Sequence, residues 1–155
     1  MTDRVFLISG IVGTILFPKL SALKGKAEKW EMTRKATFVV GTFLFFLSAG
    51  SAAIAKLVLG LLYGKAFLPA VSSFVCLMPG AFFWGISTFP LLYLSSTGLP
   101  MQVVWGWAFL TVVNVSLNFF FIPAMGGMGA AIVSTITYGL GFLIFQVYAW
   151  KLSRD

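Results

Sequence analysis

Two asparagines, Asn114 and Asn118, are the residues whose type and spacing best suit the binding of a polar ligand. They lie four positions apart in a long apolar stretch, so both project from one face of a helix. An amide side chain both donates and accepts hydrogen bonds. Inside a membrane it can hold a polar substrate in a cavity, or it can bond to a neighbouring helix. The sequence leaves both roles open.

Arg34 and Lys35 form a second candidate site at the end of a basic segment. The family resemblance given below implies that they contact the phosphates of a lipid-linked substrate at the cytoplasmic mouth of a cavity. They can equally do no more than fix the orientation of the chain, because cytoplasmic loops of membrane proteins are enriched in Lys and Arg. Both interpretations remain possible at this stage.

Covalent and metal chemistry have few candidate residues in this chain. It contains no histidine and a single cysteine, Cys76, which lies in an apolar run. The four acidic residues are dispersed, at Asp3, Glu28, Glu31 and Asp155. A nucleophile with its base, a pair of catalytic carboxylates and a metal-ligand cluster all need groups that this set does not provide. We therefore expect neither an enzyme nor a bound cofactor.

The composition indicates an integral membrane protein. Hydrophobic residues make up 59% of the chain and charged residues 10%, whereas soluble domains carry about 25% charged residues. Residues 66–150 contain no Lys, Arg, Asp or Glu at all. A net charge of +7 could suggest nucleic-acid binding, but the basic residues stand beside apolar segments rather than on a polar face. We expect a lipid bilayer as the partner and no nucleic acid.

About five membrane crossings fit the length, because each needs roughly 20 apolar residues. Glycine and proline punctuate the gaps between them, and Pro79 is expected to kink the third crossing. A basic segment, residues 19–35, is predicted to be a cytoplasmic loop or a short amphipathic helix on the membrane surface. We treat 1–155 as one all-α transmembrane region whose helices are predicted at 5–18, 36–56, 70–94, 102–122 and 129–150.

The basic residues predict the orientation of the chain. If residues 19–35 are cytoplasmic, then Lys151 and Arg154 lie on the same side after three more crossings from Lys65. Most of the Lys and Arg residues then face the cytoplasm, as the positive-inside rule requires. We therefore predict a multi-pass protein of the inner (plasma) membrane with a cytoplasmic C-terminus.

Several short motifs, in their joint order, resemble the C-terminal half of polysaccharide flippases. These are the O-antigen and oligosaccharide flippases of the multidrug/oligosaccharidyl-lipid/polysaccharide exporter (MOP) superfamily. The resemblance covers nearly the whole chain and is closest in an asparagine-containing motif followed by a glycine-rich one. The motifs are LFPKLS (16–21), LLYGKAF (61–67), LSSTGLP (94–100), VVNVSLNFFFIP (112–123) and GGMGAAIVSTITYG (126–139).

This resemblance implies a MATE-like transporter with two helical bundles around a central cavity. It implies an undecaprenyl-pyrophosphate-linked oligosaccharide as substrate, moved to the outer leaflet by alternating access and without a cofactor. The sequence has no N-terminal bundle, so we expect the missing bundle to come from a longer chain or a partner subunit. We also expect that the isolated chain does not flip lipid.

Two alternatives remain open from the sequence. One is a multidrug-type antiporter of the same superfamily, although such an antiporter would need a buried Asp or Glu that these crossings lack. The other is a small membrane subunit whose helices are completed by a partner. Copurification of a stable partner would favour this second alternative.

Overall fold

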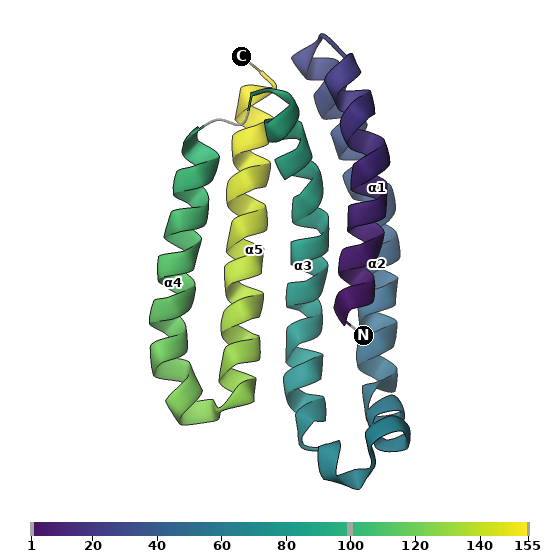
Figure 1. The fold of residues 1–155 in the computed structure, drawn as a ribbon, viewed down its shortest axis with the longest axis vertical. Coiled ribbons are helices and arrows are strands. Elements are labelled where there is room, and N and C mark those ends of the chain that lie inside the picture. The colour runs from purple at the N-terminus through teal and green to yellow at the C-terminus, as the bar shows by residue number, and fades with distance from the viewer. Residues whose placement is uncertain (1, 99–100, 155) are drawn as a thin grey trace.

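The chain folds into five long helices that run alternately up and down (Figure 1). The computed structural model describes residues 2–98 and 101–154, with side chains from Ser9 onward. No β-strand occurs within these ranges, so the prediction of an all-α fold is confirmed. The elements are α1 (Thr2–Ala22), α2 (Lys26–Tyr63), the 3-10 turn η1 (Lys65–Phe67), α3 (Ala70–Ser96), α4 (Met101–Met125) and α5 (Gly127–Leu152).

The outer faces of these helices are apolar. Helices α2 to α5 are each long and apolar enough to cross a membrane, and α1 adds a shorter apolar stretch, Ser9–Ala22. Phe38 on α2 and Phe119 on α4 are each 76% exposed. Leaving such side chains in water would cost about 1.5–3 kcal/mol each, whereas lipid receives them. The protein is therefore a multi-pass helical membrane protein.

Helix α3 lies at the centre of the arrangement. It packs against α5 on one side and against α2 and α1 on the other, whereas α4 packs chiefly against α5 at the edge (Figure 1). The contact between α3 and α5 is the most extensive in the structure. Any site between α3 and α4 is thus built over α5.

Small residues and a threonine allow α3 and α5 to approach closely. Pro79 has no N–H and leaves the Val75 carbonyl without its helical donor, yet α3 continues through it. The hydroxyl of Thr135 on α5 donates to the Cys76 carbonyl at 2.7 Å. A Cβ at Gly80 would lie only 2.9 Å from the Thr135 Cα. A hydroxyl of the neighbouring helix therefore bonds to the α3 backbone one residue from the carbonyl that the proline leaves without a donor.

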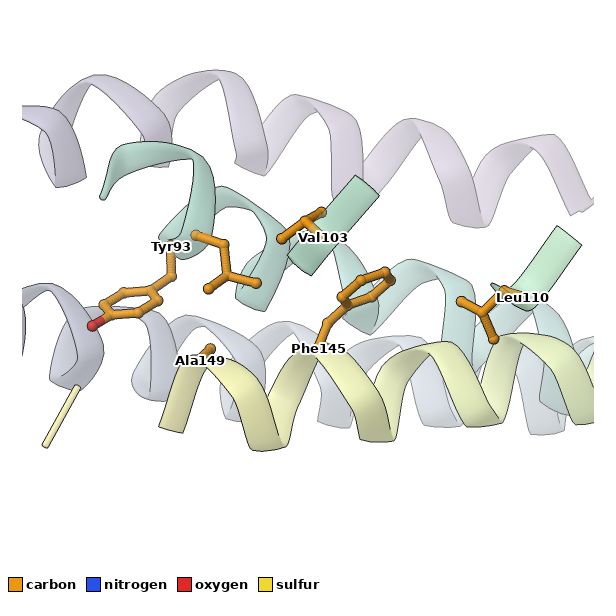
Figure 2. Packing of buried hydrophobic residues seen from close by; sticks show 6 residues of the cluster. Tyr93, Val103, Leu110, Phe145 and Ala149 are labelled. Atoms are coloured by element: carbon orange, nitrogen blue, oxygen red, sulfur yellow. The ribbon is translucent and has the colours of Figure 1, made fainter. Parts of the chain in front are cut away.

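A buried cluster fixes α4 to α5 at the end of the bundle near the C-terminus. Figure 2 shows Val103 and Leu110 of α4 beside Phe145 of α5. Gly106 makes room for this contact, because a Cβ there would lie 3.0 Å from the Phe145 ring. This packing positions the middle of α4 for the cleft described below. The cluster consists of Tyr93, Leu94, Val103, Leu110, Phe145 and Ala149.

The structure corrects the prediction for the basic segment. Residues 19–22 finish α1, which passes through Pro18, and residues 26–35 are the first turns of α2. A basic loop over 19–35 is therefore wrong, because only residues 23–25 are non-helical. Lys, Glu, Ala, Met and Arg favour helix, and the Lys29 ammonium anchors this segment by donating to the Ser96 carbonyl at 2.8 Å.

The other predicted crossings lie inside helices of the structure. Segment 36–56 is the middle of α2, and segments 70–94, 102–122 and 129–150 lie within α3, α4 and α5. Each helix extends two or more residues beyond at least one predicted end, because glycines and prolines at the gaps are partly helical. Pro123, for example, lies inside α4.

Candidate functional site

A cleft of about 170 Å³ opens between α3 and α4 over α5. Its lining combines aromatic rings with hydroxyl and amide groups, and none of the lining residues is Lys, Arg, Asp or Glu. Such a surface can bind a ligand through ring contacts and hydrogen bonds. The lining residues are Trp84 and Ser87 from α3, Trp107, Leu110, Thr111 and Asn114 from α4, and Thr137, Tyr138, Gly141 and Phe145 from α5.

The cleft lies at the mid-depth of the helices. Trp84 is close to the middle of α3 (Ala70–Ser96), and Tyr138 is close to the middle of α5 (Gly127–Leu152). Trp84 is therefore far from either end of its helix, and its side chain lines the cleft.

Helical periodicity explains why these α4 side chains share the cleft. Trp107, Leu110, Thr111 and Asn114 follow the spacing i, i+3, i+4, i+7, which places them along one face. On α5, Gly141 leaves room for the Leu110 side chain, because a Cβ at position 141 would lie only 3.1 Å from it. The local sequence therefore presents polar and aromatic groups to a single space.

Asn114 and Asn118 belong to a chain of hydrogen bonds that crosses from α4 to α5. The Asn118 amide donates to the Asn114 side-chain oxygen at 2.9 Å, and the Asn114 amide donates to the Thr137 hydroxyl at 3.2 Å. Thr137 in turn donates to the Val133 carbonyl at 2.8 Å. Asn114 thus bonds to the neighbouring helix and lines the cleft as well, while Asn118 supports it from one turn away.

Three aromatic rings form one wall of the cleft. The Trp84 ring centroid lies 4.9 Å from that of Tyr138 and 5.5 Å from that of Trp107. The Trp107 ring also lies 5.3 Å from Phe145 in the buried cluster. The packed side of each ring is thereby held in place, so the wall is preorganised for a ligand that stacks on it.

No family model, curated protein or solved structure matches this chain. Its site must therefore be interpreted from its own chemistry. Indole and phenol faces bind the apolar faces of flat ligands, while the hydroxyls of Ser87 and Thr137 and the amide of Asn114 can pair with hydroxyl groups. This combination suits an uncharged ligand with many hydroxyl groups, such as a sugar.

Arg34 and Lys35 lie apart from this cleft. Lys35 forms a salt bridge with Glu31 at 2.7 Å, and this hydrogen bond and the lysine charge lower the pKa of the exposed Glu31 carboxyl. Arg34 lines a different cleft, between α2 and α5, together with Trp30 and Gln146. The structure therefore brings Asn114 and Asn118 together but brings neither basic residue to them.

Sequence reasoning missed the residues that give the cleft its character, namely Trp84, Trp107, Thr137 and Tyr138. Counting back from Asn114 in helical steps of three and four would have found Trp107. The α3 and α5 residues are brought in by tertiary packing, which one sequence does not reveal. Within the described residues, no three His, Cys, Asp or Glu side chains gather to hold a metal ion.

Proposed function

We propose that this chain forms part of a membrane transporter that flips an undecaprenyl-pyrophosphate-linked oligosaccharide for polysaccharide biosynthesis. The observation that carries this proposal is the mid-depth cleft lined by Trp84, Trp107, Tyr138 and Asn114. The motif resemblance to the C-terminal half of polysaccharide flippases supports it. In this proposal the protein resides in the inner membrane, and its C-terminus faces the cytoplasm.

The chemistry of the cleft supports a sugar over a charged group. Transfer of a polar ligand into a membrane costs several kcal/mol unless its hydrogen bonds are replaced. Asn114, Thr137 and Ser87 supply donors and acceptors at the required depth. The aromatic wall supplies the flat surface on which a pyranose ring packs.

Alternating access supplies the mechanism in this proposal. A substrate site near the midplane becomes open to one side and then the other when two bundles rock against each other. This chain contributes one bundle, and a longer polypeptide or a partner subunit contributes the second. Asn114 acts in both states, because its bond to Thr137 keeps α4 and α5 together while its amide faces the cleft.

The aromatic wall also supports a second candidate, an exporter of organic cations. A cation is attracted to the face of Trp or Tyr within about 6 Å of the ring centroid, and the cleft presents three such rings. This candidate is the multidrug-type antiporter of the same superfamily. The two candidates differ in the ligand that the purified chain should bind.

A binding experiment with two neighbouring tryptophan variants tests the proposal. Trp107 lines the cleft, whereas Trp105 is 68% exposed on the same helix and serves as the matched control. The purified chain in detergent should bind undecaprenyl diphosphate carrying an oligosaccharide more tightly than the sugar-free lipid. Trp107→Leu should weaken that binding about fivefold, and Trp105→Leu should leave it unchanged.

Two outcomes of this titration would reject the sugar site. Equal affinity for the sugar-bearing and sugar-free lipids would show that the cleft does not recognise the oligosaccharide. Binding of tetraphenylphosphonium that is lost in Trp107→Leu, without oligosaccharide binding, would favour the cation exporter. Translation of the DNA upstream of the Met1 codon, in the same frame, separately tests whether further hydrophobic segments form the second bundle.

A further inference from the structure

A second cleft, of about 340 Å³, lies between α2 and α5. Its lining residues lie near the start of α2 and the end of α5, and these two helix ends lie at the same end of the bundle (Figure 1). Most of the basic residues of the chain lie at this end. The cleft is lined by Trp30 and Arg34 from α2 and by Gln146, Val147 and Trp150 from α5.

Two lysines in the first turns of α2 are engaged elsewhere. Lys29 is buried and donates to the Ser96 carbonyl, and Lys35 pairs with Glu31. The Arg34 guanidinium is the cation that lines the cleft. A second guanidinium, that of Arg154, lies 3.9 Å from the centroid of the Trp150 ring, and Trp150 is one of the residues that line the cleft.

Gln146 adds a buried acceptor to the same cleft. Its side-chain oxygen is buried and has no hydrogen-bond partner among the described residues. A buried acceptor of this kind loses about 1–3 kcal/mol when it is left unpaired. Gln146 lines the cleft and the terminal torsion of glutamine is broad, so a rotation of its amide would bring this oxygen to a hydroxyl-bearing ligand.

The surface below the cleft is apolar along both helices. Phe38, one turn after Arg34, is 76% exposed, and Leu143, one turn before Val147, is 58% exposed. Both lie toward the middle of the membrane from the cleft, because α2 runs away from this end and α5 runs toward it (Figure 1). A ligand with a phosphate at Arg34 therefore meets apolar side chains where its hydrocarbon would extend.

We propose that this cleft binds the headgroup of an anionic phospholipid of the bilayer, such as phosphatidylglycerol. Arg34 donates paired hydrogen bonds to the phosphate, which is the geometry that a guanidinium favours. Gln146 accepts a hydrogen bond from a headgroup hydroxyl, and an acyl chain follows Phe38 and Leu143. Basic pockets between membrane helices bind lipid headgroups in this manner. The site is independent of the proposed oligosaccharide cleft.

Two adjacent residues provide a matched test. Arg34→Gln and Lys35→Gln remove the same charge from neighbouring exposed positions, but only Arg34 lines the cleft. The purified chain in detergent is titrated with phosphatidylglycerol and with phosphatidylcholine, and retained lipid is counted by native mass spectrometry. Arg34→Gln should weaken phosphatidylglycerol binding about tenfold, whereas Lys35→Gln should change it by no more than about twofold.

Further arms distinguish the chemistry of the ligand. Soluble glycerol phosphate should not displace the lipid, because it lacks the chain that contacts Phe38 and Leu143. Gln146→Leu should reduce the preference for phosphatidylglycerol over phosphatidic acid, which has no glycerol hydroxyls in its headgroup. Equal losses in Arg34→Gln and Lys35→Gln would reduce the effect to general surface charge and overturn the site. Displacement by glycerol phosphate, or equal binding of phosphatidylcholine, would also overturn it.

Discussion

Helices α3 and α4 have nearly the same length and polarity but very different surroundings. Both lack charged residues and span 27 and 25 residues. Yet ten residues of α3 are buried and only two residues of α4, Val103 and Leu110, are buried. Lipid tails are as apolar as a protein core, so hydrophobicity alone does not draw a helix inward. Close packing at small residues and hydrogen bonds decide which helix becomes the centre.

A larger side chain at Gly80 tests whether the close approach of α3 to α5 makes α3 the central helix. Gly80→Leu should destabilise the chain by about 3 kcal/mol or more, because the added side chain meets the backbone of Thr135, which cannot rotate away. The melting temperature in detergent should fall by about 6–12 °C. Fluorescence-detected size exclusion after heating measures this shift.

Gly50→Leu is the control for this change. Gly50 lies in α2, and a Cβ added there would meet nothing within 4 Å outside the backbone of its own helix. The same substitution should therefore leave the melting temperature almost unchanged. An equal loss in both variants would show that leucine disturbs any glycine of these helices. The close approach of α3 and α5 would then not explain why α3 is central.

A smaller effect is expected from the hydrogen bond between α5 and α3. Thr135→Val removes the donor to the Cys76 carbonyl and should cost about 1 kcal/mol, the typical value for such bonds in membranes. Thr42→Val is matched to it, because the Thr42 hydroxyl is exposed and bonds only within its own helix, to Phe38. Its melting temperature should stay within about 1 °C of the wild type.

The sequence predicted the helices well and their packing poorly, for a physical reason. The uncharged stretch 66–150 had to cross the membrane three times, and α3, α4 and α5 follow this requirement. Pro18 was expected to end α1, but a membrane helix can continue through proline. Residues 26–35 were predicted as part of a basic loop or of a short surface helix because they are charged. They form the first turns of α2, and most of their side chains favour helix.

At the candidate site, too, the sequence predicts positions within one helix but not the contacts between helices. The spacing of Asn114 and Asn118 predicted one helix face, and their side chains are 2.9 Å apart; their role in substrate binding stays a prediction. The depth of Trp84 could have been read from its position in the segment 70–94. Its contact with Tyr138 could not, because it depends on which faces of α3 and α5 meet.

Two phenylalanines, one on the outer face of α4 and one in the interior of α3, test the difference in burial between these helices. Phe119 on α4 is 76% exposed, whereas Phe89 on α3 is fully buried beside Leu16 and Leu20. Phe119→Ala should change the free energy of unfolding by less than about 0.5 kcal/mol, because the ring contacts detergent or lipid in the folded and in the unfolded state. Phe89→Ala leaves a cavity and should cost about 3 kcal/mol. If the two variants lost equal stability, the α4 face would have to be packed against protein in solution, and α4 would be as interior as α3.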